Sequence, residues 1–169
     1  MRNAIRSRRL FPAVLLLLVI PLAVLAEAPA VALHVTGEVS NHLELSLADI
    51  ATLKHRTVRV TDEKGNSIEY GGVAVADILQ KAGAPLDKRL RGPAMALGVV
   101  ASAPDGYRVV YSLAEFDPAF SDRVIILADT RDGKALDSHE GPLRIVAPGD
   151  KRGARWIRGV NSLEIVKVR

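Results

Sequence analysis

GPLRIVAPGDKRGARWIR, residues 141–158, is the stretch around which the chain is organised. Its first half is a short apolar run between a Gly-Pro and a Pro-Gly pair, a pattern that predicts a buried strand. Its second half carries two glycines, four cationic residues and Trp156, the only tryptophan of the chain. The stretch therefore predicts a strand that leads into a basic, glycine-rich loop.

The residue types of this loop suit a flat anionic or heteroaromatic ligand. Backbone near glycine can approach a ligand closely, arginine guanidinium groups grip phosphate or carboxylate oxygens, and an indole face can stack on a flat ring. Arg152, Arg155, Trp156 and Arg158 are therefore candidate contact residues. The alternative is a solvated charged loop in which Trp156 packs for stability alone.

Residues 1–26 have the three parts of a secretory signal peptide. Four arginines precede an apolar run at residues 10–25, and residues 24–26 offer small side chains for cleavage. An uncleaved anchor is the alternative, but this run contains two prolines and is short for a span of about 20 residues. Residues 7–11 also fit the twin-arginine pattern, although the strongly apolar run favours the general secretory route. We expect an exported, periplasmic protein whose mature form is not embedded in the membrane.

Residues 27–169 have the length of one domain. Cleavage after residue 26 removes four arginines and no acid, so that 23 basic and 19 acidic residues become 19 of each. The basic character of the full chain thus comes from its leader, and it does not indicate a nucleic-acid partner. The chain has no cysteine, which excludes thiolate metal ligands, iron–sulfur clusters and thiol catalysis.

Local patterns predict an α+β fold with mixed sheets and short helices at their edges. Ser46 and Ser112 are placed to cap short helices, the second with Glu115 in a capping box, and residues 75–82 have helical apolar spacing. We expect about eight strands. The strand segments with the clearest patterns are residues 31–39, 57–61, 67–70, 96–103, 107–111, 124–128, 143–147 and 160–168.

Five further residues are candidate site residues because of where they stand in this pattern. Asp105 and Tyr107 flank a hairpin turn, Asp129 follows a buried strand, and His139 and Glu140 directly precede the 141–158 stretch. Each also has a purely structural interpretation, as a turn, a strand end or a surface side chain. The four histidines show no metal-ligand spacing, and no phosphate-binding loop, dinucleotide fingerprint or nucleophile elbow is present.

Several motifs follow one another in a specific order along residues 33–168. They are Tyr70-Gly71-Gly72-Val73 with Asp77-Ile78-Leu79 and Ala82-Gly83, Asp105-Gly106-Tyr107, Leu127-Ala128-Asp129, Gly141-Pro142-Leu143-Arg144-Ile145-Val146 with Pro148, and Arg155 and Arg158 before Leu163-Glu164-Ile165. This ordered set resembles the molybdopterin-binding domain of the sulfite oxidase family. The resemblance implies a compact α+β fold with a pterin cofactor in a cleft, which Arg155 and Arg158 contact.

The chain departs from that family in the residue that binds the metal. Family enzymes hold molybdenum through a cysteine placed before the Tyr70–Val73 segment, and residues 60–66 contain none. Trp156 also stands beside Arg155, whereas the enzymes tend to carry tryptophan at the position of Gly159. The chain also lacks the second, dimerising domain of larger members. Small exported relatives of this shape are similar to periplasmic pterin-binding proteins, which bind a reduced pterin without metal and work with membrane enzymes of cyclic-di-GMP signalling.

Three hypotheses follow. The first is a non-catalytic periplasmic module that binds a reduced or molybdopterin-like pterin without molybdenum and reports to a membrane-bound sensor or cyclic-di-GMP enzyme. In it Trp156 stacks on the pterin, the loop arginines contact its polar edge, and a carboxylate accepts its N–H groups, the candidates being Asp105, Asp129 and Glu140. The second is an oxidoreductase that holds molybdopterin without the usual cysteine. The third is an interaction domain without a ligand.

Overall fold

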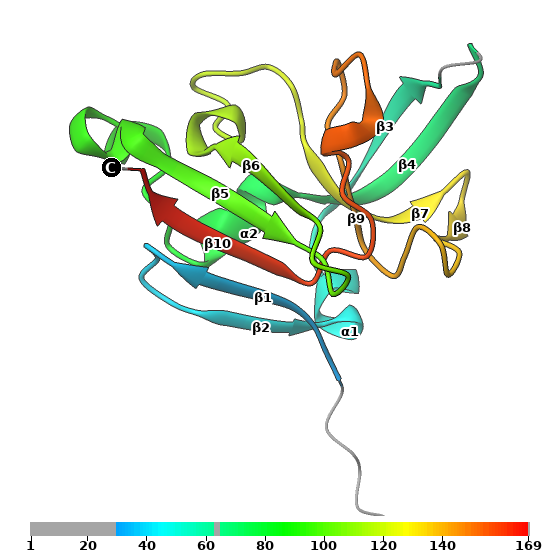
Figure 1. The fold of residues 1–169 in the computed structure, drawn as a ribbon, viewed down its shortest axis with the longest axis horizontal. Coiled ribbons are helices and arrows are strands. Elements are labelled where there is room, and N and C mark those ends of the chain that lie inside the picture. Colours follow the sequence, from blue (N-terminus) through cyan, green and yellow to red (C-terminus); the bar gives the residue numbers. More distant parts are fainter. Residues whose placement is uncertain (1–29, 63–64, 169) are drawn as a thin grey trace, which may run out of the picture.

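The structure is a computed structural model that describes residues 30–62 and 65–168. The predicted signal peptide, residues 1–26, lies outside the described residues. The described chain forms two five-stranded sheets with short helices at their margins (Figure 1), which is the α+β class expected from the sequence. Within these residues we find no helix with the length and apolar character needed to cross a membrane.

The first sheet has the strand order β2-β1-β10-β5-β6, and the second has the order β3-β4-β7-β8 with β9 also paired to β7. The strands are β1 (Val31–Gly37), β2 (Leu43–Ser46), β3 (His55–Thr61), β4 (Ser67–Ala74), β5 (Leu97–Ser102), β6 (Arg108–Ser112), β7 (Ile126–Arg131), β8 (Lys134–Ala135), β9 (Arg144–Val146) and β10 (Ser162–Lys167). The helices are α1 (Leu47–Ala51) and α2 (Val75–Lys81), and the 3-10 turns are η1 (Asp87–Arg89), η2 (Gly92–Ala96), η3 (Leu113–Glu115) and η4 (Gly153–Arg155).

The short helices begin where the sequence predicts. The Ser46 hydroxyl accepts the Asp49 N–H at 3.1 Å, and the Asp49 carboxylate accepts the Ser46 N–H at 2.9 Å. The same reciprocal capping box starts η3 at Ser112, with Glu115 as its partner. These caps satisfy backbone N–H groups that the first helical turn leaves without partners. The short strands β2 and β8 were not predicted, because two to four residues carry too little alternation to be recognised.

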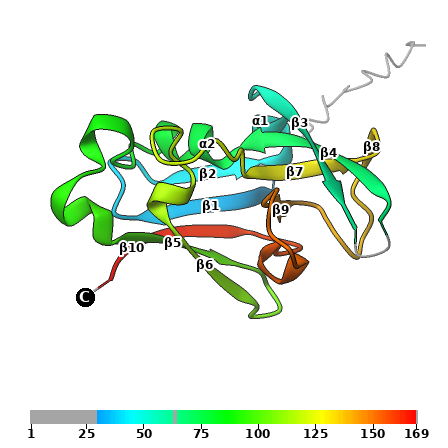
Figure 2. The same cartoon turned by 90° about the horizontal axis from the view of Figure 1, so that it is seen from above.

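The C-terminal strand β10 lies in the middle of the first sheet. It runs parallel to β1 on one side and antiparallel to β5 on the other, with Leu163 paired to Val35 and to Ala101. Figure 2 shows β9 and the loop that follows it between this sheet and the second one. Because β10 pairs with β1, the last strand of the domain is hydrogen-bonded to its first strand.

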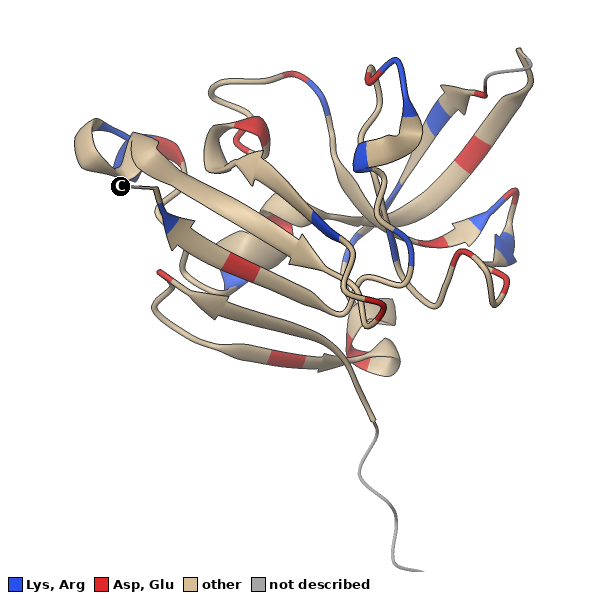
Figure 3. Ribbon diagram, viewed as in Figure 1, with Lys and Arg blue, Asp and Glu red and all other residues tan. Residues whose placement is uncertain are grey.

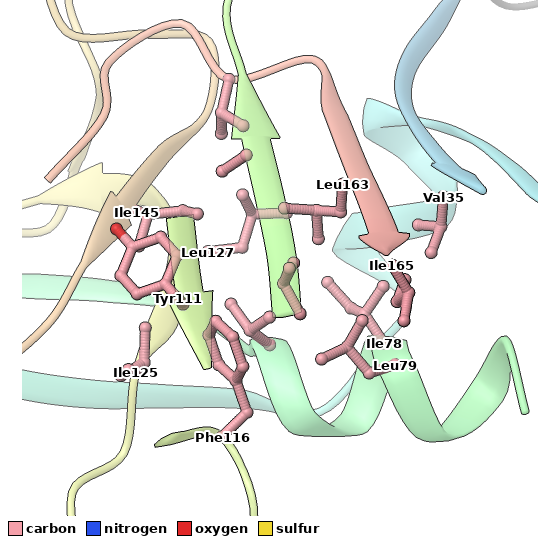
Figure 4. Packing of buried hydrophobic residues seen from close by; sticks show 14 of the residues in the cluster. Val35, Ile78, Leu79, Tyr111, Phe116, Ile125, Leu127, Ile145, Leu163 and Ile165 are labelled. Atoms are coloured by element: carbon pink, nitrogen blue, oxygen red, sulfur yellow. The ribbon is translucent and has the colours of Figure 1, made fainter. Parts of the chain in front are cut away.

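The larger of two hydrophobic clusters in the described residues contains residues of both sheets, and the smaller one lies within the second sheet. Val35 and Leu163 of the first sheet, and Leu127 and Ile145 of the second, are all fully buried in the larger cluster. Figure 4 shows Tyr111, Ile145 and the α2 residues Ile78 and Leu79 among the members of this core. Because a single cluster contains residues of both sheets, the sheets are held to each other by apolar burial.

The 141–158 stretch folds back on itself and ends close to where it began. β9 pairs with β7, and the Ile145 N–H donates to the Ile157 carbonyl at 2.9 Å. An isolated bridge places Arg144 opposite Arg158. The predicted strand followed by a basic loop is confirmed, and the loop is closed at its base. Figure 3 shows an acidic segment next to basic ones along this loop.

Candidate functional site

A cavity of about 590 Å³ opens where three segments of the chain meet. They are the turn between β5 and β6, the residues just before β9, and the loop around η4. We call it the main cavity. It is lined by Ala103, Pro104, Asp105, Tyr107, Ser138, His139, Gly141, Arg144, Gly153, Ala154, Trp156, Ile157, Arg158 and Gly159. Its volume lies within the range of about 300–1,000 Å³ that is typical of small-molecule sites.

Five of the nine residues selected from the sequence line the main cavity: Asp105, Tyr107, His139, Trp156 and Arg158. The hairpin turn presents the first two. The Asp105 carboxylate accepts the Tyr107 N–H at 2.9 Å, which fixes the turn, and the Tyr107 hydroxyl donates to the Ala154 carbonyl at 2.7 Å. The turn is thus both a structural element and one wall of the cavity.

Arg158 and His139 form a polar pair at the main cavity. One guanidinium nitrogen of Arg158 lies 3.0 Å from Nδ1 and 2.9 Å from Nε2 of His139. The pair offers a ligand the fixed positive charge of Arg158.

Trp156 and Arg144 stand between the main cavity and a second one of about 300 Å³, because both residues line both cavities. The Trp156 indole N–H donates to the Ala147 carbonyl at 3.0 Å, which fixes the ring. The Arg144 guanidinium lies 5.8 Å from the Trp156 ring centre and 5.4 Å from that of Tyr70. These distances are those of cation–π contacts.

Glu140 lies at the second cavity, where its carboxylate is shared by several groups. It contacts Arg144 at 2.7 Å and Arg131 at 2.8 Å, and the Tyr70 hydroxyl lies 3.5 Å away. Burial raises the pKa of Tyr70, and the Glu140 charge adds to that effect against the opposing arginines. Because Glu140 already has these partners and does not line the main cavity, it is poorly placed to accept hydrogen bonds from a ligand there.

Arg144 is the site residue that sequence reasoning missed, because it was counted as part of a buried strand. Its side chain is only 11% exposed, and its Nε–H has no acceptor among the described residues. A buried donor without a partner is rare in folded proteins. The signal in the sequence was a charged residue between Leu143 and Ile145, at a position where an apolar side chain would be expected.

Arg155 does not line either cavity. Its guanidinium binds Glu115 at 2.8 and 3.2 Å and Asp150 at 2.9 and 3.2 Å, and it lies 4.9 Å from the Tyr111 ring centre. The hydrogen bonds that it donates to Glu115 and then to Asp150 raise the pKa of Arg155 above its ordinary value. Arg152 is exposed and also lines neither cavity.

Asp129 is likewise outside the main cavity and pairs with His55 of β3. Its Oδ2 lies 2.8 Å from Nε2 of the imidazole, while Nδ1 lies 2.9 Å from the Leu53 carbonyl oxygen. A carboxylate and a carbonyl both accept hydrogen bonds, so these two partners favour the protonated imidazole, in which both ring nitrogens donate. The hydrogen bond to Asp129, followed by that to Leu53, raises the pKa of His55.

Comparison with known proteins agrees with this architecture. The model of the family described as "Oxidoreductase molybdopterin binding domain" matches residues 20–169. The solved structure of the sulfane dehydrogenase SoxCD from Paracoccus pantotrophus is similar, with a TM-score of 0.62 and 22% sequence identity. The match covers 79% of this chain and 37% of the SoxCD chain, so this chain spans little more than a third of that relative's length. None of the curated proteins compared with it matches.

The fold and the cavity define an α+β domain of the sulfite oxidase type. The chain belongs to the oxidoreductase molybdopterin-binding domain family, as the ordered motifs predicted, and the family implies a cofactor of the pterin type.

The residues of the main cavity fit the organic part of such a cofactor. Asp105 supplies a carboxylate acceptor, Arg144 and Arg158 supply donors, and Trp156 supplies an aromatic side chain. The donor set does not fit thiolate-bound molybdenum, because the sequence has no cysteine. In the part of the chain that the structure describes, no three His, Asp or Glu side chains cluster as metal ligands.

Proposed function

We propose that the chain is a non-catalytic pterin-binding module that takes up a reduced pterin in the main cavity. The observation that carries this proposal is the meeting of Asp105, Arg158 and Trp156 at one cavity, in a chain of a molybdopterin-binding family that has no cysteine. A pterin has a flat ring with amino and N–H donors at one edge and ring nitrogen and oxygen acceptors at others. The carboxylate complements the donors, and the guanidinium groups complement the acceptors.

The first experiment is to purify the protein from its own host under low oxygen. Extracts are examined for a pterin by fluorescence and mass spectrometry, and molybdenum is measured on the same sample. We expect a stoichiometric pterin without molybdenum. Stoichiometric molybdenum would instead identify an oxidoreductase with a metal site free of protein thiolate. The absence of both, together with no binding of added tetrahydrobiopterin, would support an interaction domain without a ligand.

A variant experiment then tests the site itself. Replacing both Arg158 and Trp156 by alanine removes the exposed cation and the aromatic ring of the main cavity, so tetrahydrobiopterin binding should fall by about 100-fold or more. The matched control is Arg152→Ala, which removes an arginine of the same loop that lines neither cavity. Equal affinity in the double variant and the control would reject the main cavity as the pterin site.

We also infer that the module works outside the cytoplasm and reports to a membrane partner. The support is the signal-peptide pattern of residues 1–26 and the similarity to periplasmic pterin-binding proteins that serve cyclic-di-GMP enzymes. Mass spectrometry of the protein from the periplasmic fraction should give an N-terminus at Glu27. Crosslinking in intact cells should then capture a membrane sensor or cyclic-di-GMP enzyme in a pterin-dependent way. A protein that retains residues 1–26 would contradict the first part, and capture unaffected by pterin depletion would contradict the second.

A further inference from the structure

We propose that Arg155 is a positioning residue, which fastens the η4 loop to the first sheet and thereby presents Trp156 to the main cavity. The sequence suggested instead that Arg155 contacts the ligand. The part of this proposal that concerns ligand affinity rests on the proposed pterin binding. The part that concerns Trp156 does not, and it can be tested on the protein without ligand.

The guanidinium of Arg155 is already occupied on its edges and on one face. Nη1 and Nη2 meet the two carboxylate oxygens of Glu115 in a bidentate pair, and Nε and Nη2 meet both oxygens of Asp150. The Tyr111 ring lies against the group at 4.9 Å. A guanidinium has five N–H donors in a fixed plane, and four of these directions serve the two carboxylates. Nothing comparable is left to grip a ligand.

The same contacts join parts of the chain that are distant in sequence. Glu115 also accepts the Ser112 N–H at 3.0 Å, which ties the network to the N-cap of η3. Arg123 lies 3.3 Å from Asp150 and 3.7 Å from Glu115. Two arginines and two carboxylates therefore form a charge-balanced cluster that links η3, the segment before β7 and the loop after β9. We call it the Arg155 cluster.

The backbone of η4 is held on the same side. The Tyr111 hydroxyl donates to the Arg155 carbonyl, and the Tyr107 hydroxyl donates to the Ala154 carbonyl at 2.7 Å. Two tyrosines, one just before β6 and one near its end, thus hold two successive carbonyl groups. Trp156 is the next residue, so these two hydrogen bonds position its backbone. The hydrogen bond from its indole N–H to the Ala147 carbonyl then orients its ring.

The contact between Arg155 and Asp150 also connects the two ends of the exposed part of the loop. It joins the residue after the Gly149 turn to the residue before Trp156, so that the exposed residues between them form a closed ring of chain. Fixing such a loop in advance lowers the conformational entropy that a ligand must otherwise remove on binding. Loss of Arg155 should therefore free the loop and weaken binding without removing any direct ligand contact.

The first test uses the sole tryptophan of the chain and needs no ligand. Arg155→Ala should shift Trp156 emission to longer wavelength and increase its quenching by acrylamide, because the ring gains solvent and motion. Arg155→Lys should give an intermediate result, since lysine keeps the charge but cannot form the bidentate pair. The matched control, Arg152→Ala, should leave emission and quenching unchanged. Unchanged Trp156 emission and quenching in a folded Arg155→Ala protein would overturn the proposal.

The second test separates positioning from direct contact by a double-mutant cycle with tetrahydrobiopterin. Arg155→Ala should weaken binding about tenfold in the wild-type background and clearly less in a Glu115→Gln background, where the pair is already weakened. A direct ligand contact would instead cost the same factor in both backgrounds. Should the wild-type protein bind no tetrahydrobiopterin, the proposed function fails, while the fluorescence test still decides the role of Arg155.

Discussion

At the scale of single residues, arginines of one loop have opposite roles. Arg158 lines the main cavity, whereas Arg155, three positions earlier, is turned away from it by Glu115 and Asp150.

In the second sheet, two adjacent glycines lie where the pairing of β4 with β7 shifts its register. Gly71 and Gly72 of β4 pair with Thr130 and Ala128, so Asp129 of β7 is an extra, bulged residue.

Gly72 is expected to tolerate no side chain. A Cβ atom there would overlap the Leu127 carbonyl oxygen and the Ala128 Cα of the neighbouring strand. We expect Gly72→Ala to lower the free energy of unfolding by about 3 kcal/mol, measured by urea unfolding, because backbone must move to make room. Gly65→Ala is the control, since its Cβ would meet no atom of the described residues within 4 Å. It should cost only the ~1–2 kcal/mol of its left-handed backbone. Equal losses in both variants would show that the crowding at Gly72 is relieved.

At the scale of elements, the contact between His55 and Asp129 bridges two strands that are not neighbours. β4 lies between β3 and β7, and the two side chains meet across it beside the glycine pair. Asp129 was selected from the sequence as a ligand contact at the end of a strand. The structure assigns its Oδ2 to His55, while its buried Oδ1 has no partner among the described residues.

This bridge should make the stability of the domain depend on pH. The pKa of His55 is raised in the folded protein, so its contribution is fully present below the unfolded pKa of about 6.5. That contribution is lost as the pH rises through the raised, folded pKa. The free energy of unfolding should therefore fall as the pH rises from about 6.5 through the raised pKa of His55, and His55→Gln should remove this part of the decrease. The exposed His42 serves as the control in His42→Gln, which should keep the wild-type profile.

At the scale of the whole molecule, one core joins both sheets and so should make them unfold together. The main hydrophobic cluster includes β1 and β10 of the first sheet and β4, β7 and β9 of the second. The main cavity opens at the margin of this core, between the β5–β6 turn and the loop that follows β9. The site therefore depends on how the two sheets are held relative to each other.

A core truncation tests this cooperativity. Leu127 is fully buried, and Leu127→Ala should lower the free energy of unfolding by about 2–5 kcal/mol. Circular dichroism and Trp156 fluorescence should report one shared transition in the variant as in the wild type. Val110→Ala, at an exposed position of β6, should change stability by less than about 0.5 kcal/mol. Separate transitions for the two signals would mean that the sheets unfold independently.

The local elements and the chemical limits of the site follow from the sequence alone. Capping residues at Ser46 and Ser112, helical spacing in α2 and the alternation of the strands are properties of neighbouring residues, so they can be recognised without the fold. The absence of cysteine can likewise be read directly from the sequence. The sequence predicts Asp105, Tyr107, His139, Trp156 and Arg158 as cofactor contacts; the structure places all five around one cavity, and their contact with a cofactor stays a prediction.

Only the tertiary structure decided which charged side chains face the cavity and which hold the loop in place. Arg144 and Arg155 show the reason. Arg144 reaches both cavities because β9 is paired between β7 and the returning chain, and Arg155 turns away because Glu115, 40 residues earlier, lies beside it. Such partners come from distant parts of the chain, and neither residue type nor local spacing records them. The sequence thus determined the elements and the kind of chemistry, while the packing of the sheets assigned each arginine its role.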